Sequence, residues 1–452
     1  MEPIEDKCTT SIFPKLPFLL EDHEDTVLKA FFANPKDNLP QQTCPDPPLS
    51  LPLSIQDRIR ILTTLLERVQ TPGSFQWWIE LSSKARAHVI IFLSENAGDR
   101  LPWSTLESRD IVKNICNKIT SGLKASDVEY AEEQECEGLS LWFQWNFSHS
   151  LTPQDADFHI ILQLLRKKLK KVDWKYFPVS AHAFGWLLKQ IQGPNLSDFV
   201  DLIIPPCLLF TDDYYDDYKL LGLECMLHVV QNADRTDLLR NNWANVMYDA
   251  VQRLCTDKDP LVIQRVMSIL MNLLGCIEKD PSEYSAEFTK YDDLMKTILF
   301  QMEFRSDVVQ KRIWLPIFDN FLQACGTAVL HWSDRICGML KDSTVCNDPE
   351  IWISILQCTS TVIKNTWMNT DCESIAEIIL RVVLNVSSFN AAKATEGEKQ
   401  QIFSDAANCL ILLQQCEGFS SVETQIKEIT KNETKYFFHP EFITKLKICM
   451  TK

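Results

Sequence analysis

Apolar positions in the stretch 211–255 recur every three or four residues, first in one segment and then in a second. The first set is Leu220, Leu221, Leu223, Met226, Leu227 and Val230, and the second is Val246, Met247, Ala250, Val251 and Leu254. This spacing is typical of helices that bury one face. A polar break at 232–234 separates the two segments. The pattern therefore predicts a helical hairpin, and neither helix can bury its apolar side alone.

The same two-helix unit recurs downstream. The predicted first helices are 259–277, 308–325, 348–367 and 398–416, and their partners are 288–303, 328–341, 372–386 and a weaker C-terminal segment. First helices that start near 215, 259, 308, 350 and 398 are spaced by 44, 49, 42 and 48 residues. HEAT and armadillo units span roughly 40–47 residues. The expected fold is all-α, an α-solenoid of HEAT/armadillo-like helical hairpins with an irregular helical N-terminal half.

Two of the predicted helices open with the dipeptide Asp-Pro, at Asp259-Pro260 and Asp348-Pro349. An aspartate at the N-cap position accepts hydrogen bonds from the free amides of the first turn. Proline at the first helical position gives up only an amide that has no helical partner. Both dipeptides therefore predict helix starts.

The N-terminal half has helical patterning without regular spacing. Helices are predicted at 55–66, 75–94, 106–119, 158–170 and 181–191, with an acidic loop at 127–137 and a short helix at 21–33. Prolines at 35, 40, 45, 47, 48 and 52 make 34–52 a linker, because proline interrupts helices. The expected organisation is an N-terminal segment 1–52 that is partly disordered, an irregular helical region 53–204, and a solenoid 205–452 continuous with it.

Composition and charge argue against a secreted, membrane-spanning or nucleic-acid-binding protein. The first residues are acidic, no secretory signal is evident and no apolar run approaches the roughly 20 residues that span a membrane. The 16 cysteines are scattered without a Cys-x-x-Cys pair, which favours free thiols in a reducing compartment. The expected location is the cytoplasm, with the nucleus as a second one. A net charge of −16 argues against a nucleic-acid-binding surface.

One basic run, Arg166-Lys167-Lys168-Leu169-Lys170-Lys171, stands out against this charge. It ends a predicted helix that begins near Asp155, where cations are favoured by the negative end of the helix dipole. A solvated helix terminus and a docking patch for an acidic partner are both compatible with it.

No sequence constellation for catalysis is found. There is no nucleophile elbow, phosphate-binding glycine loop, His-Glu-x-x-His or dinucleotide motif. The cluster Asp212, Asp213, Asp216 and Asp217 lacks the glycine and distal glutamate of a calcium loop, and a cap for the following helix explains it more simply. The expectation is a protein that is not an enzyme and has no catalytic, cofactor-binding or metal-binding residues.

The residues of 205–255 resemble a known family, the Tel-two-interacting protein two family. The matches are Pro205, Thr211-Asp212-Asp213-Tyr214, Lys219, Leu221-Gly222, Cys225, His228, Leu238-Leu239, Tyr248 and Ala250. Supporting matches lie upstream at Pro102-Trp103, Arg109, Phe184 and Trp186, and downstream at Ile355-Leu356, Thr366-Trp367, Cys409 to Leu413 and Cys416. The resemblance extends from about residue 90 to 416, and the acidic pair Asp216-Asp217 departs from it.

The resemblance implies a non-catalytic scaffold subunit of the Triple T complex. Its partners would be a Tti-one homologue, bound directly, and a Tel-two homologue. The implied assembly acts as a co-chaperone with the ninety-kilodalton heat-shock chaperone machinery. It supports maturation and stability of phosphatidylinositol-3-kinase-related kinases, including the TOR and DNA-damage kinases.

The family motif also supplies the candidate site. Asp212, Asp213, Tyr214, Lys219, Gly222 and His228 are expected to form either a partner-binding surface or a structural corner. Two other functional classes rest on fold analogy alone. These are a HEAT-type adaptor in nuclear transport or trafficking and a phosphatase scaffold.

Overall fold

The computed structural model describes residues 53–71, 73–98, 101–126, 138–281, 288–304, 307–367, 369–387, 394–420, 422–424 and 426. These residues form α-helices joined by turns and short 3₁₀ helices, with no strand among them. The chain divides into two compact units, Met1–Trp243 and Ala244–Lys452. The predicted segments 1–52 and 127–137, with nearly all of the C-terminal partner segment, lie outside the described residues. The predicted division at 204/205 stays a prediction, and residue 204 lies within helix α10.

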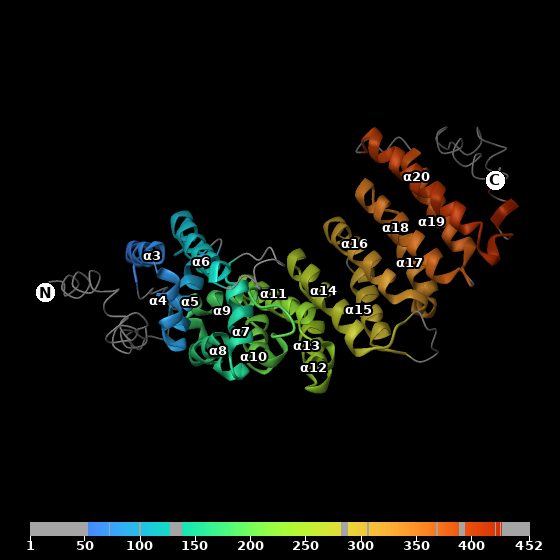
Figure 1. Ribbon diagram of the computed structural model, residues 1–452. Helices are drawn as coiled ribbons and strands as arrows, with labels where there is room; N and C mark the ends of the chain where they lie inside the picture. Colours follow the sequence, from blue (N-terminus) through green and yellow to red (C-terminus); the bar gives the residue numbers. More distant parts are fainter. Residues whose placement is uncertain are drawn as a thin grey trace. The chain divides into compact units, whose positions relative to one another are not determined.

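The helices of the first unit are numbered in the order in which they occur along the chain (Figure 1). They are α3 (Ile55–Gln70), α4 (Ser74–Glu80), α5 (Ser83–Ala97), α6 (Leu106–Ser126), α7 (Ser140–His149), α8 (Asp157–Lys168), α9 (Pro178–Leu188), α10 (Val200–Thr211), α11 (Asp216–Asn232) and α12 (Arg235–Arg240). The second unit holds nearly all of α13 (Trp243–Gln252), then α14 (Pro260–Ile277), α15 (Lys290–Phe304), α16 (Val308–Cys325), α17 (Ser333–Ser343), α18 (Pro349–Thr366), α19 (Cys372–Ser387) and α20 (Glu396–Leu413).

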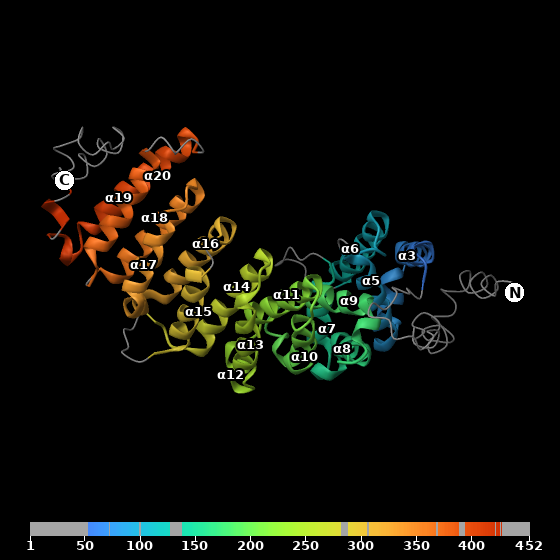
Figure 2. The ribbon, with the colours of Figure 1, turned by 180° about the vertical axis from the view of Figure 1, so that it is seen from behind.

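The second unit is a stack of helical pairs in two layers. Helices α14, α16, α18 and α20 pack on one another in succession, and α15, α17 and α19 do the same in the other layer (Figures 1 and 2). Each pair buries the apolar face that its neighbour leaves open, which is the principle of a solenoid. The first helices begin at 260, 308, 349 and 396, close to the predicted starts. The predicted all-α solenoid of HEAT/armadillo-like hairpins is confirmed.

Side-chain caps fix the starts of these first helices. Asp259 Oδ1 accepts hydrogen bonds from the amides of Leu261 at 2.7 Å and Val262 at 3.1 Å. Asp348 caps α18 and is also hydrogen-bonded by the Arg312 guanidinium of α16. Burial works against ionisation of Asp348, but these hydrogen bonds outweigh it and lower its pKa. Both Asp-Pro starts are confirmed, and Asp348 links neighbouring pairs as well.

Two stretches of this unit, Pro260–Ile277 and Val308–Ser343, are long and apolar enough to cross a membrane by length and composition alone. Core helices of soluble proteins pass the same test. In α14 the side chains of Leu270, Leu273 and Leu274 are buried within the unit. This burial is what a core helix shows, so composition here reflects packing between pairs.

The first unit stacks in a similar way toward its end but departs from the predicted elements near its start. Helices α5, α9 and α11 pack in succession, and α8 packs on α10. The predicted helices do not include α7 or α10, and α10 contains two prolines, Pro205 and Pro206. The single helix predicted at 75–94 is wrong. It is two helices, α4 and α5, because Leu81 is extended and Ser82 caps α5 by accepting the Ala85 amide at 3.2 Å.

A second correction concerns the hairpin at 211–255. The break near 232–234 is confirmed, but the second segment is interrupted again. The short α12 is followed by a left-handed residue, Asn242 with φ 59°, before α13 begins. Asparagine tolerates this conformation better than most residues, so it permits the turn.

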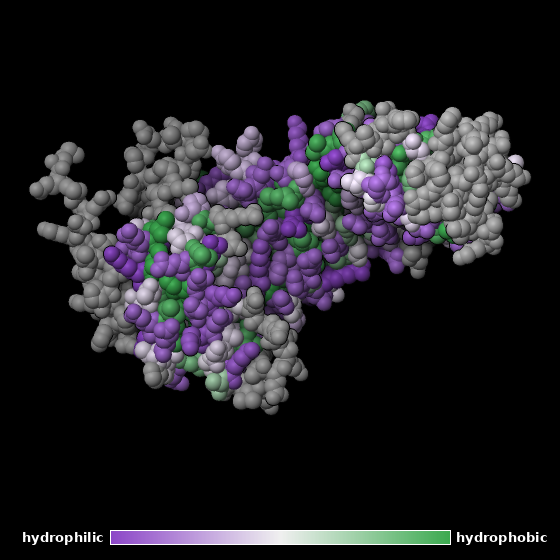
Figure 3. Space-filling model, turned by 90° about the horizontal axis from the view of Figure 1, so that it is seen from above, coloured by the Kyte–Doolittle hydropathy of each residue, from purple (hydrophilic) through white to green (hydrophobic). Residues whose placement is uncertain are grey.

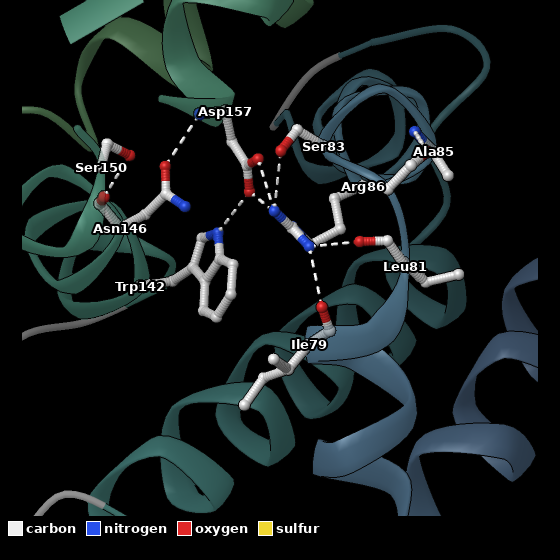
Figure 4. A network of polar contacts seen from close by, with 10 residues as sticks. Ile79, Leu81, Ser83, Ala85, Arg86, Trp142, Asn146, Ser150 and Asp157 are labelled. Atoms are coloured by element: carbon white, nitrogen blue, oxygen red, sulfur yellow. Dashed lines mark hydrogen bonds and ion pairs between the residues drawn. The ribbon is translucent and has the colours of Figure 1, made fainter. Parts of the chain in front are cut away.

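A buried ion pair joins four helices of the first unit (Figure 4). The Arg86 guanidinium of α5 donates to both carboxylate oxygens of Asp157, at 2.8 and 3.0 Å, where α8 begins. Trp142 Nε1 of α7 donates to the same carboxylate at 3.2 Å, and Arg86 Nη1 donates to the Ile79 carbonyl of α4 at 3.1 Å. Asp157 is fully buried. Polar contacts thus stabilise the irregular start of the unit, and no local sequence pattern predicts them.

The cysteines of the described residues are free thiols, and most of them are buried. Burial raises the pKa of the Cys409 and Cys116 thiols to about 12, so both stay protonated at neutral pH. They behave as small apolar side chains. On the face seen in Figure 3, hydrophilic residues cover most of the described surface, with apolar areas between them.

Candidate interaction surface

The candidate residues gather at the corner between α10 and α11. Asp212 ends α10, and its amide donates to the Leu208 carbonyl at 3.1 Å. The next residue, Asp213, is buried, whereas Tyr214 is 89% exposed. The corner therefore mixes one inward carboxylate with an outward aromatic ring.

Asp213 stabilises the turn between α10 and α11 through both of its carboxylate oxygens. Its Oδ1 accepts the Tyr215 amide at 3.0 Å, and its Oδ2 pairs with Lys175 Nζ at 2.6 Å. The expectation that Asp212 or Asp213 caps α11 needs correction. The N-cap residue of α11 is Tyr215, which has no side-chain cap, and Asp213 stabilises the turn just before it. The partner lysine comes from the 3₁₀ helix η5 (Trp174–Tyr176), an element that the sequence analysis did not predict.

Aromatic packing brings η5 to this corner. The Trp174 ring lies 5.2 Å from the Phe210 ring of α10 and 4.9 Å from the Tyr218 ring of α11. Trp174 itself is buried. Burial raises the pKa of Tyr218, and the nearby carboxylates of Asp213 and Asp217 add to that effect. Tyr218 therefore remains a neutral phenol at physiological pH.

Lys219 pairs within its own helix. Its Nζ lies 2.9 Å from Asp216 Oδ1, one helical turn away. His228 is nine residues further along, about 180° around a helix with 3.6 residues per turn. Lys219 and His228 therefore do not share a face of α11.

Gly222 lies close against the backbone of α10. A Cβ at this position would lie 2.5 Å from the Thr211 amide nitrogen and 2.8 Å from the Cys207 carbonyl oxygen. These are backbone atoms that cannot move aside like a flexible side chain. The hydrogen atom of glycine is thus what allows the two helices to touch.

His228 links α11 to the end of α9. Its Nε2 lies 2.7 Å from the Ile191 carbonyl oxygen, and Asn232 Nδ2 donates to the His228 carbonyl at 2.9 Å. Burial lowers the pKa of His228, although the bond to the carbonyl acts in the opposite direction. A neutral imidazole that donates from Nε2 fits these contacts. Its role is structural, whereas Asp212 and Tyr214 face solvent.

The basic run ends α8, as expected. Arg166 and Lys167 are exposed on its last turn, and Lys170 and Lys171 follow in the exposed loop that leads to η5. Lys168 differs, because its Nζ lies 5.8 Å from the Phe177 ring centroid. Burial lowers the pKa of Lys168, and the nearby Arg58 lowers it further against the opposing effect of Glu95. In the described residues, no group of three or more His, Cys, Asp or Glu side chains is arranged to hold a metal ion.

Removing the Asp213 carboxylate is expected to destabilise the corner without touching its exposed ring. Asp213→Ala should lower the free energy of unfolding by about 1.5–3 kcal/mol, because a buried charged hydrogen bond is lost. Tyr214→Ala should change it by less than about 0.5 kcal/mol, since the ring is exposed. Urea denaturation followed by tryptophan fluorescence measures both. The adjacent exposed Asp212→Ala is the matched control, and equal losses for Asp212→Ala and Asp213→Ala would contradict the assignment.

Comparisons with known proteins point to one family. Residues 89–301 match the model of the Tti2 family. The chain is 28% identical over 327 residues to TELO2-interacting protein 2 of Homo sapiens, covering 70% of this chain and 60% of the relative. The Rattus norvegicus protein of the same name is 29% identical, covering 61% of this chain and 54% of the relative. The matched part thus spans only about half to three fifths of these relatives.

Among solved structures, importin beta aligns over 87% of this chain and 54% of that chain, with a TM-score of 0.49 and 10% sequence identity. The karyopherin Kap121p, in its complex with the extreme C-terminus of the phosphatase Cdc14p, aligns over 93% of this chain and 40% of that chain, with a TM-score of 0.43 and 11% identity. The family match includes the whole α10–α11 corner.

Proposed function

We propose, on the premise that this chain belongs to the Tti2 family, that it is a non-catalytic scaffold subunit bound directly to a Tti-one homologue and assembled with a Tel-two homologue. The observation that carries the proposal is the family match over residues 89–301. The curated relatives support it, because they are named for an interaction and not for a reaction.

The work of this assembly is the maturation of large kinases. In the proposal, the complex assists the ninety-kilodalton heat-shock chaperone machinery in folding and stabilising phosphatidylinositol-3-kinase-related kinases, among them the TOR and DNA-damage kinases. The chain acts in the cytoplasm and in the nucleus, where such kinases operate. It binds and positions other proteins and catalyses no reaction itself.

Stacked helical pairs suit this work physically. Each pair adds a further stretch of surface, and many modest contacts along it sum to a stable complex. Caps such as Asp259 fix where a helix starts, and links such as Arg312–Asp348 join neighbouring pairs. A surface built in this way can hold a large partner without a cavity that encloses it.

Acute depletion in the cells that make this protein tests the proposed function. A degradation tag on the chain is expected to lower the steady-state amounts of the TOR and DNA-damage kinases several-fold, with their transcripts unchanged. Quantitative mass spectrometry measures the amounts, and re-expression of the untagged chain should restore them. Unrelated protein kinases serve as the control. Unchanged amounts of every phosphatidylinositol-3-kinase-related kinase after complete depletion would rule the proposed function out.

A further inference from the structure

One exposed surface of the first unit combines lysines with apolar and aromatic side chains. We call it the Tyr–Lys surface and define it by Lys170, Lys171, Val172, Tyr176, Tyr214 and Tyr215. Val172 is 82% exposed, Tyr214 89% and Tyr215 50%, so together they present apolar and aromatic area to solvent. The surface joins the end of the basic run to the α10–α11 corner.

The backbone holds this surface in place. The Lys170 carbonyl accepts hydrogen bonds from the amides of Asp173 at 2.9 Å and Trp174 at 3.0 Å, which closes a tight turn. Lys171 and Val172 lie within that turn. The buried Trp174 ring then fixes the turn against α10 and α11, as described above. The exposed side chains are therefore presented from an anchored segment.

The corner residues are linked to the same segment. Lys175 Nζ pairs with Asp213 and lies 5.9 Å from the Tyr215 ring centroid, and the Tyr214 and Tyr215 rings are 5.8 Å apart. Tyrosines presented on a fixed backbone lose little conformational entropy on binding, and they are enriched among the residues that dominate protein interfaces. The geometry favours a contact surface for a protein.

Charge indicates what kind of segment would bind. On a chain of net charge −16, Arg166, Lys167, Lys170 and Lys171 form a local positive region. Such a region attracts carboxylates and speeds their encounter. The exposed Asp212, Asp216 and Asp217 flank the two tyrosines along the chain. A continuous polyanion such as a nucleic acid or an anionic membrane would be repelled there, whereas a peptide can place its acidic residues on the lysines alone.

We propose that the Tyr–Lys surface is the docking site for an acidic segment of a partner protein, whose carboxylates meet the lysines and whose apolar side chains pack on the tyrosines. This inference rests on the proposed scaffold function and names one contact surface and its chemistry. Basic residues flanking the acidic part of the segment would face Asp216 and Asp217. The surface therefore favours a segment that combines acidic, apolar and basic residues over one that is only negatively charged.

Fluorescence anisotropy on the purified full chain tests this docking site. The probe is a short fluorescein-labelled peptide of Glu-Glu-Phe repeats with a pair of lysines at each end. Lys170→Glu with Lys171→Glu is expected to raise its Kd at least about tenfold, equivalent to about 1.4 kcal/mol, and Tyr214→Ala to raise it several-fold. The matched control is Lys113→Glu with Lys118→Glu on exposed positions of α6, which changes the net charge equally.

The outcomes separate the sources of binding. An equal loss in the α6 control would show that overall charge alone attracts the probe and would overturn the proposal. A second contrary result is that single-stranded DNA or phosphatidylserine vesicles bind as tightly as the peptide and lose that binding in the Lys170→Glu, Lys171→Glu variant. That result would overturn the proposal that the site binds a protein segment. All variants change exposed residues, and circular dichroism and melting confirm that they fold.

The same variants distinguish this inference from the proposed function. If the wild-type chain captures the Tti-one homologue but does not bind the acidic probe, the docking site is wrong and the scaffold function stands. If the probe binds in a manner that depends on Lys170 and Lys171 but no Tti-one homologue is captured, the proposed assembly is wrong and the docking site stands.

Discussion

Replacing Asp157 by alanine is expected to lower the free energy of unfolding of the first unit by about 3–5 kcal/mol, the range found when one partner of a buried ion pair is removed. The change leaves the Arg86 guanidinium buried without its counterion. It also removes the acceptor of the Trp142 indole N–H, because both groups bond to this carboxylate. Urea denaturation followed by circular dichroism measures the loss.

The double variant Arg86→Met with Asp157→Leu is the control for this prediction. Replacement of a whole buried ion pair by apolar residues of similar size is often neutral. The double variant should therefore be clearly more stable than Asp157→Ala, although Trp142 still lacks its acceptor. A single variant within about 0.5 kcal/mol of wild type would show that this ion pair does not hold α4, α5, α7 and α8 together.

Adding even one carbon at Gly222 is expected to destabilise the chain. Alanine is favoured over glycine by about 1 kcal/mol inside a helix, so a free helical position would gain stability. At Gly222 the new Cβ would overlap the backbone of α10 at 2.5 and 2.8 Å. Overpacking of this kind costs about 1–3 kcal/mol, and Gly222→Val should cost more than Gly222→Ala.

Gly338 supplies the matched control, because it lies in the middle of α17 and a Cβ there would meet nothing within 4 Å. Gly338→Ala is expected to raise the free energy of unfolding by about 0.5–1 kcal/mol. Chemical denaturation midpoints of the two alanine variants should therefore shift in opposite directions. Shifts of the same sign would show that α11 does not depend on close approach to α10.

The regular part of the fold was predictable from the sequence because its signals are local. The bounds of α14 and α16 agree with the prediction to within a residue, since a cap residue marks each start and the apolar period persists over many turns. The break between α4 and α5 was missed. Besides the Ser82 cap, the break involves Arg86, which donates to the Leu81 carbonyl and to Asp157, 71 residues further along the chain.

The candidate corner was predictable only in part, because it also depends on contacts between residues far apart in the sequence. The motif located Asp213 and Gly222, but the partner of Asp213 is Lys175, which comes from a different element. Trp174 places Lys175 beside Asp213 by packing on Phe210, and no periodicity in the sequence predicts that contact. The exposure of Tyr214 and the inward orientation of Asp213 likewise follow from the turn and not from residue type.

The most direct test of the central claim is the mass of a complex in solution. The full chain is co-expressed with the Tti-one homologue of its own organism, and the pair is analysed by size-exclusion chromatography with light scattering. The proposed scaffold function predicts one species whose mass is the sum of the two chains and which persists at micromolar concentration. Separate elution of two folded proteins at that concentration would contradict it.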